Sequence, residues 1–199
     1  MQRRNLLLGA GALGFGFVTA LALPAQAANA AEDFVRGNIQ TGFDILNDRN
    51  TSASERRDRF ATFLLGLTDV KRVALFLLGS HAAGASQADL DAYVAAYQDY
   101  VLTVYQTYFQ LYAGQTLRVI SSRERAPGDF IVAANMVGQP NSTMEIDFRI
   151  RTDQAKPLLM DVAIAGVWLA LAQRDQIQAV LAQNNGDIKA LVAHLRGKS

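Results

Sequence analysis

The residue types that most often carry chemistry are few in this chain, and they are not spaced as a catalytic or metal site requires. Cysteine is absent, which excludes disulfides, thiol catalysis and thiolate metal sites. The two histidines, His81 and His194, lie far apart, have no neighbours at ligand spacing and are expected at the surface. We therefore expect no metal and no cofactor.

The motif search also favours a binding protein over an enzyme. The run from Gly9 to Gly14 fits G-x-G-x-x-G but follows no strand, and no G-x-S-x-G elbow or Walker loop is present. Asp147 and Asp161 alternate outward on predicted strands, so no carboxylate pair is expected to face an interior. What remains is an excess of apolar residues, which suits either a large core or an enclosed apolar guest. An enzyme stays as the alternative.

Residues 1–27 are interpreted as an export signal, and residues 28–199 as a single domain. Arg3 and Arg4 precede an uncharged, glycine-bearing stretch, and Ala27 ends a small-residue cleavage site. The arginine pair resembles a twin-arginine signal, and an ordinary secretory signal also fits. A single anchoring helix is the alternative, although four glycines lower the hydrophobicity of the stretch. The formal net charge of +1 does not indicate a nucleic-acid partner.

Two strands stand out because apolar and polar residues alternate with period two. In the run from Ser142 to Arg151 the apolar positions alternate with four charged residues, so one face of the strand is dry. The run 157–166 repeats the pattern and ends at Gly166. The apolar positions of the two runs are Met144, Ile146, Phe148, Ile150, Leu158, Met160, Val162 and Ile164.

Two further strands, 116–122 and 129–137, complete a predicted four-stranded antiparallel sheet. Apolar residues at helical spacing predict helices on both sides of this segment. Candidate N-caps are Ser52, Thr68 or Asp69, Ser86 and Asp187. The expected helices are 32–46, about 51–67, 69–78, 86–112, 169–182 and a last one from 187. The fold class is α+β, with helices packed over one face of a curved sheet.

All six tyrosines lie on the helix predicted for 86–112. They share one side of it with several valines and leucines. A stripe of this kind is typical of a core in which the hydroxyls find partners at the rim, and it also suits a ligand enclosed under the helix. Both interpretations stay open.

The motifs resemble the MlaC family of periplasmic phospholipid-binding proteins, also called the toluene-tolerance family. The resemblance rests on Leu78-Gly79 before the helix from Ser86, on Tyr112 to Gln115, on Met160 to Val167, on Gln173 to Gln176 and on Gly186 to Ile188. Two positions depart from the family pattern. Ala165 stands where an acidic residue is usual, and Ala155 to Pro157 replaces a Gly-x-Trp-like turn. A hopanoid-associated branch of the family is therefore kept as an alternative.

The resemblance implies a sheet like that of nuclear transport factor 2 (NTF2-like), with lipid tails held between sheet and helices and the head group in water. It also implies a monomeric carrier in the periplasm that maintains outer-membrane lipid asymmetry. Such a carrier shuttles phospholipid between an outer-membrane lipoprotein complex and an inner-membrane ABC transporter complex. Under this hypothesis the protein is not an enzyme, and a hopanoid or other isoprenoid is the alternative cargo.

A lipid carrier needs a deep cavity, because a surface groove leaves much of each acyl chain in water. We predict lipid-binding residues from both layers. From the sheet they are Phe130, Val132, Met144, Ile146, Phe148, Ile150, Met160, Val162 and Ile164, and from the helices Val73, Phe76, Leu77, Tyr97, Val101, Val104, Tyr105 and Tyr108.

Overall fold

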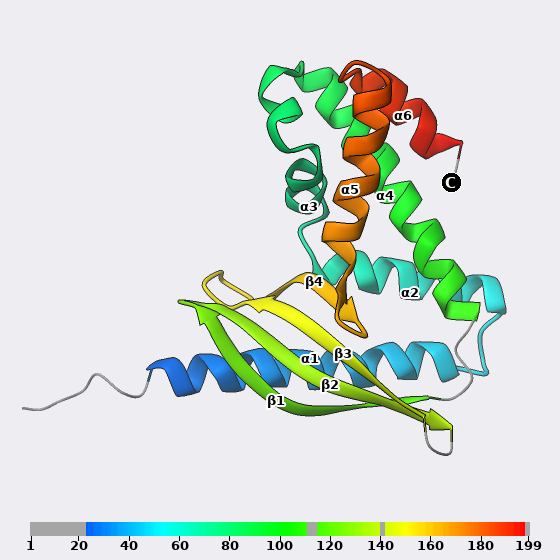
Figure 1. Ribbon diagram of the computed structural model, residues 1–199. Coiled ribbons are helices and arrows are strands. Elements are labelled where there is room, and N and C mark those ends of the chain that lie inside the picture. The colour runs from blue at the N-terminus through cyan, green and yellow to red at the C-terminus, as the bar shows by residue number, and fades with distance from the viewer. Residues whose placement is uncertain (1–22, 111–114, 140–141, 198–199) are drawn as a thin grey trace, which may run out of the picture.

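A five-stranded antiparallel sheet runs through the lower half of the molecule in the computed structural model (Figure 1). The structure describes residues 23–110, 115–139 and 142–197. The strands follow one another in sequence order: β1 (Thr116–Ala126), β2 (Asp129–Gln139), β3 (Ser142–Arg151), β4 (Leu158–Ile164) and β5 (Val167–Trp168). The α+β class is confirmed with one correction, since the sheet has five strands and four were predicted.

The fifth strand follows β4 through a two-residue turn, Ala165-Gly166. Both turn residues have positive φ, 49° for Ala165 and 81° for Gly166, as a type I′ hairpin turn requires. β5 pairs only with Ala163 and Ile164, so it is too short to show any alternation in the sequence. This pairing also leaves residues 158–162 of β4 at a free edge of the sheet.

The register of the sheet agrees with the predicted alternation in β3, whereas the prediction for β4 is partly wrong. A register shift between Arg149 and Ile150 makes Leu159 the partner of Ile150 and Leu158 the partner of Arg151, so Leu158 lies on the opposite face and Met160 falls within the shift. Ile150 pairs with Phe130, and Phe148 pairs with both Val132 and Val162, so these apolar side chains share one face. Arg149 pairs with Ile131 and Asp161 on the opposite face. β1 extends to Ala126, beyond its predicted end, because the turn to β2 needs only Pro127 and Gly128.

The described residues form six α-helices, which lie along one face of the sheet and beyond β4. They are α1 (Leu23–Asn47), α2 (Ala53–Leu67), α3 (Val70–Leu78), α4 (Gln87–Gln110), α5 (Leu169–Gln183) and α6 (Ile188–Arg196), with a 3₁₀ helix, η1 (Gly79–Gly84), between α3 and α4. α1 lies along one face of the sheet, whereas α3 to α6 form a bundle that stands beyond β4 (Figure 1). α1 begins nine residues before the predicted start, so the predicted cleavage site after Ala27 falls inside it and stays a prediction.

The predicted helix caps explain where the helices begin. The Ser52, Ser86 and Asp187 side chains accept hydrogen bonds from the backbone N–H of Glu55, Asp89 and Lys189. Asp69, one of the two candidates for the third helix, accepts from Arg72 N–H. The Asp89 carboxylate also accepts a hydrogen bond from the Ser86 hydroxyl, so Ser86 and Asp89 are bonded to each other in both directions.

The molecule has two separate cores. The bundle buries Leu77, Leu78, Tyr93, Leu181 and Leu191 completely among α3, α4, α5 and α6. The second core lies between α1 and the sheet, where the small Ala31 and Val35 pack on Phe130, Val132 and Ile150. Tyr97 of the bundle core and Leu159 beside the second core line a space between the two. No helix among the described residues is both long and apolar enough to span a bilayer.

Candidate functional site

An apolar cavity of about 200 Å³ lies between α1, α2 and one face of the sheet. For comparison, a cavity of roughly 150 Å³ lined by Leu, Ile and Phe stays dry and binds benzene. Nearly all lining side chains are apolar, and Asn38 is the polar exception. The lining residues are Phe34, Val35, Asn38, Ile39, Gly42, Phe43, Leu46, Phe60, Phe63, Leu64, Leu67, Leu117, Phe148, Ile150, Leu159 and Val162.

The N-terminal half of α1 packs closely on the sheet. Ala31 and Val35 are buried there, and Glu32 accepts a hydrogen bond of 2.6 Å from the Ser122 hydroxyl on β1. Farther along α1, α2 provides the adjoining wall. The two helices are adjacent at Gly42, where a Cβ would lie in van der Waals contact with the Phe63 ring, at 3.4 Å.

α2 is the least firmly packed wall of the cavity. None of its 15 residues is buried, although Phe60, Phe63, Leu64 and Leu67 all face the cavity. Apolar side chains that line a cavity lack partner atoms on one side and lose their dispersion contacts. An apolar guest would supply those contacts.

A narrower space of about 60 Å³ lies next to this cavity, at the free edge of β4. We call it the neck. It shares Leu64, Leu159 and Val162 with the cavity and is closed on its other side by α3, α4 and α5. The Tyr97 hydroxyl donates a 2.6 Å hydrogen bond to Oε1 of Gln173 in the wall of the neck, so the polar atom of this buried tyrosine is satisfied.

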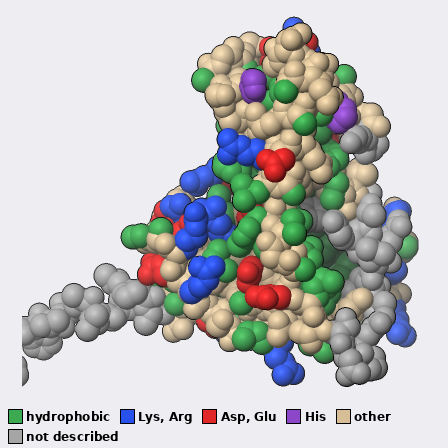
Figure 2. All heavy atoms as spheres, in the orientation of Figure 1, with side chains coloured by type: hydrophobic (Ala, Val, Ile, Leu, Met, Phe, Trp, Pro, Cys, Tyr) green, Lys and Arg blue, Asp and Glu red, His purple; other side chains and the backbone are tan. Residues whose placement is uncertain are grey.

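A wider cleft of about 620 Å³ lies on the opposite face of the sheet, where the sheet meets α3 and α5. We call it the arginine cleft, because five arginines line it: Arg72, Arg123, Arg125, Arg149 and Arg151. Figure 2 shows basic side chains gathered on this side of the molecule, next to hydrophobic side chains at the base of the bundle.

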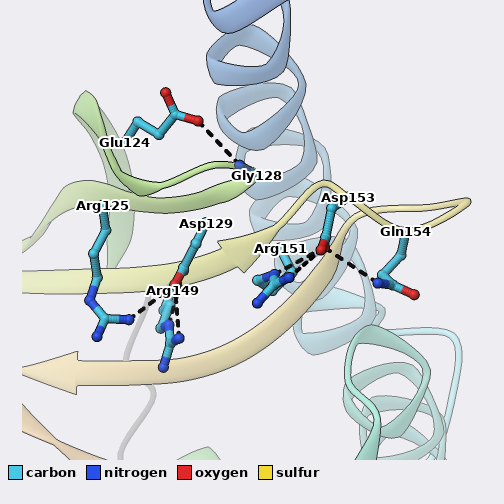
Figure 3. Close-up of polar contacts among 8 residues, drawn as sticks. All are labelled: Glu124, Arg125, Gly128, Asp129, Arg149, Arg151, Asp153 and Gln154. Atoms are coloured by element: carbon cyan, nitrogen blue, oxygen red, sulfur yellow. Dashed lines mark hydrogen bonds and ion pairs between the residues drawn. The ribbon is translucent and has the colours of Figure 1, made fainter.

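Asp129 is the buried anion beneath this cleft, and it organises two of the arginines (Figure 3). Arg149 donates two hydrogen bonds to the carboxylate, 3.0 and 2.8 Å long, and Arg125 donates one of 3.0 Å. Burial disfavours the charged carboxylate, but the two guanidinium groups outweigh it and hold the pKa of Asp129 below its usual value. Arg151 pairs separately with Asp153.

Asp161 lies where the neck meets the arginine cleft and lines both. Its Oδ1 accepts hydrogen bonds from the backbone N–H of Val162 and Ala170, at 2.8 and 2.9 Å. Burial raises the pKa of this carboxyl above its ordinary value, and these bonds and the charge of Arg149 only partly oppose the shift. The second bond fixes the start of α5 against β4.

The predicted lipid-binding residues fall into several environments. Phe148, Ile150 and Val162 line the cavity, and Val73, Tyr97, Val101, Met160 and again Val162 line the neck. Phe130 and Val132 are buried beside the cavity under α1. Ile146 is buried opposite Ile164 farther along the same face, outside the lining of either space.

Four other predicted residues lie away from the cavity. Leu77 is in the bundle core, Met144 is 40% exposed, and Phe76 is exposed in the arginine cleft under the guanidinium of Arg174. Val104 is half-buried on α4 and is not part of either lining. The side chains of Tyr105 and Tyr108 lie outside the described residues. Phe76, Leu77 and Val104 lie away from the cavity because α3 and α4 pack on other helices and not on the sheet.

The sequence reasoning missed the two helices that form most of the cavity wall. The signal was present, since α1 and α2 contribute four phenylalanines, Phe34, Phe43, Phe60 and Phe63. We interpreted these helices as amphipathic cover for the sheet. An apolar stripe looks the same in sequence whether it meets protein atoms or an open space.

Groups for metal or acid–base chemistry do not converge in the cavity. Within the described residues no cluster of three His, Asp or Glu side chains could hold a metal ion. His81 lies in η1 and His194 in α6, both remote from the lining. The cavity wall offers shape and apolar surface, which suits it to binding.

Comparisons with known proteins agree with this geometry. A profile of the MlaC protein family matches residues 36–197. The chain is similar in structure to a phospholipid-binding protein from Ralstonia solanacearum, solved in complex with a phospholipid, with a TM-score of 0.69. The two share 16% sequence identity, and the match covers 86% of this chain and 96% of that one. At this identity the likeness shows a common fold. No curated protein matches the chain.

Proposed function

Because the chain belongs to the MlaC family, we propose that it is a phospholipid carrier that holds acyl chains between α1, α2 and the sheet. The observation that carries the proposal is the apolar cavity, in which Asn38 is the single polar residue of the lining. Its amide donates a 2.6 Å hydrogen bond to the Phe34 carbonyl of the same helix, which satisfies one of its two N–H donors.

The hydrophobic effect sets the strength of such binding. Each buried methylene contributes roughly 0.8 kcal/mol, so a C16 chain with about 14 of them carries on the order of 11 kcal/mol of gross transfer free energy. The same quantity opposes release into water. Release therefore needs an apolar acceptor at the mouth of the cavity, and the protein itself consumes no nucleotide.

The loosely packed α2 suits this exchange. No residue of α2 is buried, whereas α3 to α6 each bury apolar residues in the bundle core, so α2 is the helix expected to move most readily. In this proposal α2 moves away from α1 to admit an acyl chain and closes over it, and the closed form is stabilised by contacts between the chain and the phenylalanines of both helices.

The finer parts of the proposal follow from the family. The mature protein works in the periplasm as a monomer after loss of residues 1–27. It passes phospholipid between an outer-membrane lipoprotein complex and an inner-membrane ABC transporter complex.

The direct test is to purify the protein without detergent, extract it with organic solvent and weigh the extract by mass spectrometry. We expect phospholipid in close to stoichiometric amount. A polycyclic mass would replace phospholipid by a hopanoid as cargo. A clean extract, from protein that also fails to take up added lipid, would overturn the carrier proposal and return attention to an enzyme.

Matched variants locate the cargo. Val162→Asp places a charge in the wall shared by cavity and neck, and should remove most of the bound lipid. Val167→Asp places the same charge on β5, where the side chain is 57% exposed, and should leave the lipid content unchanged. Circular dichroism of both variants checks that they are folded. Full lipid occupancy in a folded Val162→Asp protein would refute this cavity as the binding site.

A further inference from the structure

The arginine cleft is not needed to hold acyl chains, yet it adjoins, through the wall of the neck, the cavity proposed to hold them. The neck shares three residues with the cavity and four with the cleft, namely Val73, Met160, Asp161 and Ala170. Cavity, neck and cleft are therefore adjoining spaces, although the cavity and the cleft lie on opposite faces of the sheet.

The three spaces adjoin one another at the edge of β4. Val162 and Asp161 are neighbours in the chain, and their side chains point to opposite faces, Val162 into the cavity and Asp161 into the cleft. In the described part of the chain no strand covers this edge, because β5 pairs only with Ala163 and Ile164. A flexible amphiphile can thus have its apolar part on one face and its polar end on the other.

The cleft has the chemistry of an anion site. Five arginines line it, against a single lining carboxylate, that of Asp161. Arg125, Arg149 and Arg151 are already held by Asp129 and Asp153. Among the described residues, Arg72 on α3 and Arg123 on β1 have no acidic or hydrogen-bonding partner for their guanidinium groups, and both side chains are exposed. They approach the cleft from opposite sides with their donors available.

A phosphate ester fits this arrangement better than a carboxylate peptide does. A guanidinium group binds two phosphate oxygens with parallel hydrogen bonds, and arginine is preferred wherever such recognition matters. Trp168, Phe76 and Leu171 form an apolar border beside the arginines. Such a mixed surface suits the part of a lipid where a phosphate meets glycerol and acyl carbons.

We propose that the arginine cleft binds the phosphate group of a phospholipid whose acyl chains reach the cavity through the neck, with Arg72 and Arg123 as the principal ligands. This inference rests on the proposed carrier function. It replaces the expectation that the head group is simply left in water.

The test compares two lipids with identical acyl chains, phosphatidic acid and diacylglycerol, on delipidated protein. Wild-type protein should prefer phosphatidic acid by about tenfold or more, since charge-assisted hydrogen bonds to the phosphate are absent with diacylglycerol. The double variant Arg72→Ala/Arg123→Ala should lose most of this preference and bind diacylglycerol within about twofold of wild type. The control Arg49→Ala/Arg196→Ala removes the same charge from two exposed positions elsewhere and should keep the preference.

The outcomes separate this inference from the function on which it rests. If both lipids bind wild type equally well, or if the cleft variant keeps the wild-type preference, the cleft assignment is wrong and the carrier function stands. If neither lipid binds, both fail. Inorganic phosphate that binds wild-type protein without weakening phosphatidic acid would indicate free phosphate as the ligand and would overturn the head-group assignment.

Discussion

Gly42 offers the sharpest test of where the acyl chain lies. It sits on α1 in the cavity lining, and a Cβ built there meets the rings of Phe63 and Phe60 at 3.4 and 3.6 Å, which is ordinary van der Waals contact. A leucine at this position is therefore expected to fit and to extend its outer carbons into the cavity.

The magnitude follows from the volume that the side chain takes. Leucine carries four carbons, and displacing about four methylenes of lipid removes roughly 3 kcal/mol of transfer free energy. That corresponds to roughly 150-fold weaker lipid binding. The delipidated variant should be slightly more stable than wild type, because replacing a helical glycine by leucine gains on the order of 0.5–1 kcal/mol.

Gly37→Leu is the matched control. Gly37 lies on the same helix, is exposed and has no atom within 4 Å of a Cβ, so it receives the same gain in helix propensity without filling the cavity. Displacement of a fluorescent fatty acid measures lipid affinity, and thermal unfolding of delipidated protein measures stability. If Gly42→Leu is folded and binds lipid as tightly as Gly37→Leu, the acyl chain does not lie between α1 and α2, and the reasoning is refuted.

Three further predictions concern the sheet. Arg149→Met removes two of the three hydrogen bonds to buried Asp129 and should lower the free energy of unfolding in urea by about 2–3 kcal/mol. Arg125→Met removes the single bond from a half-exposed side chain and should lower it by less than about 1 kcal/mol. An equal loss of stability in both variants would contradict the assigned roles. Because the pKa of Asp129 is lowered in the folded protein, its contribution to stability is present above the usual carboxyl pKa and is lost as the pH falls through the folded value, so Arg149→Met should show a weaker acid dependence. The pH dependence that Asp161 contributes to stability has the opposite sign. Burial raises the pKa of Asp161, so its contribution to stability is present below the ordinary value of 3.8 and is lost as the pH rises through the folded pKa. Asp161→Asn, whose side-chain oxygen still accepts from Val162 and Ala170, should therefore be at least as stable as wild type at pH 7, and a clear destabilisation there would show that the charged form is needed. Ala165→Asn places a residue that tolerates positive φ in the β4–β5 turn and should raise stability by about 0.5–1 kcal/mol, and a lower melting temperature would argue against the type I′ turn.

The local features of this fold were readable from sequence because their causes are local. The alternation from Ser142 to Arg151 identified the dry face of β3, and the pairing of Phe148 and Ile150 agrees with it. Ser52, Ser86 and Asp187 were predicted as caps because their side chains need only backbone groups two or three residues away. The two-residue strand β5 was missed because it is too short to show a period.

The site was only partly predictable, because its definition depends on contacts between distant segments. Phe148, Ile150 and Val162 were selected from the sheet and do line the cavity, whereas Leu77 was selected from α3 and packs in the bundle core. Nothing in the local pattern distinguishes these cases. Each is an apolar residue on the apolar side of its element.

The sequence alone therefore determined which side of β3 avoids water, where most elements begin, and that cysteine chemistry is absent, whereas the register shift in β4 was visible only in the structure. Only the tertiary structure decided that α1 and α2 face an open space, that α3 to α6 pack on one another, and that five arginines gather across the sheet from that space. The physical reason is that hydrophobic burial is non-directional. A periodic apolar stripe specifies that a surface must be covered, and the packing of the whole chain decides whether protein or ligand covers it.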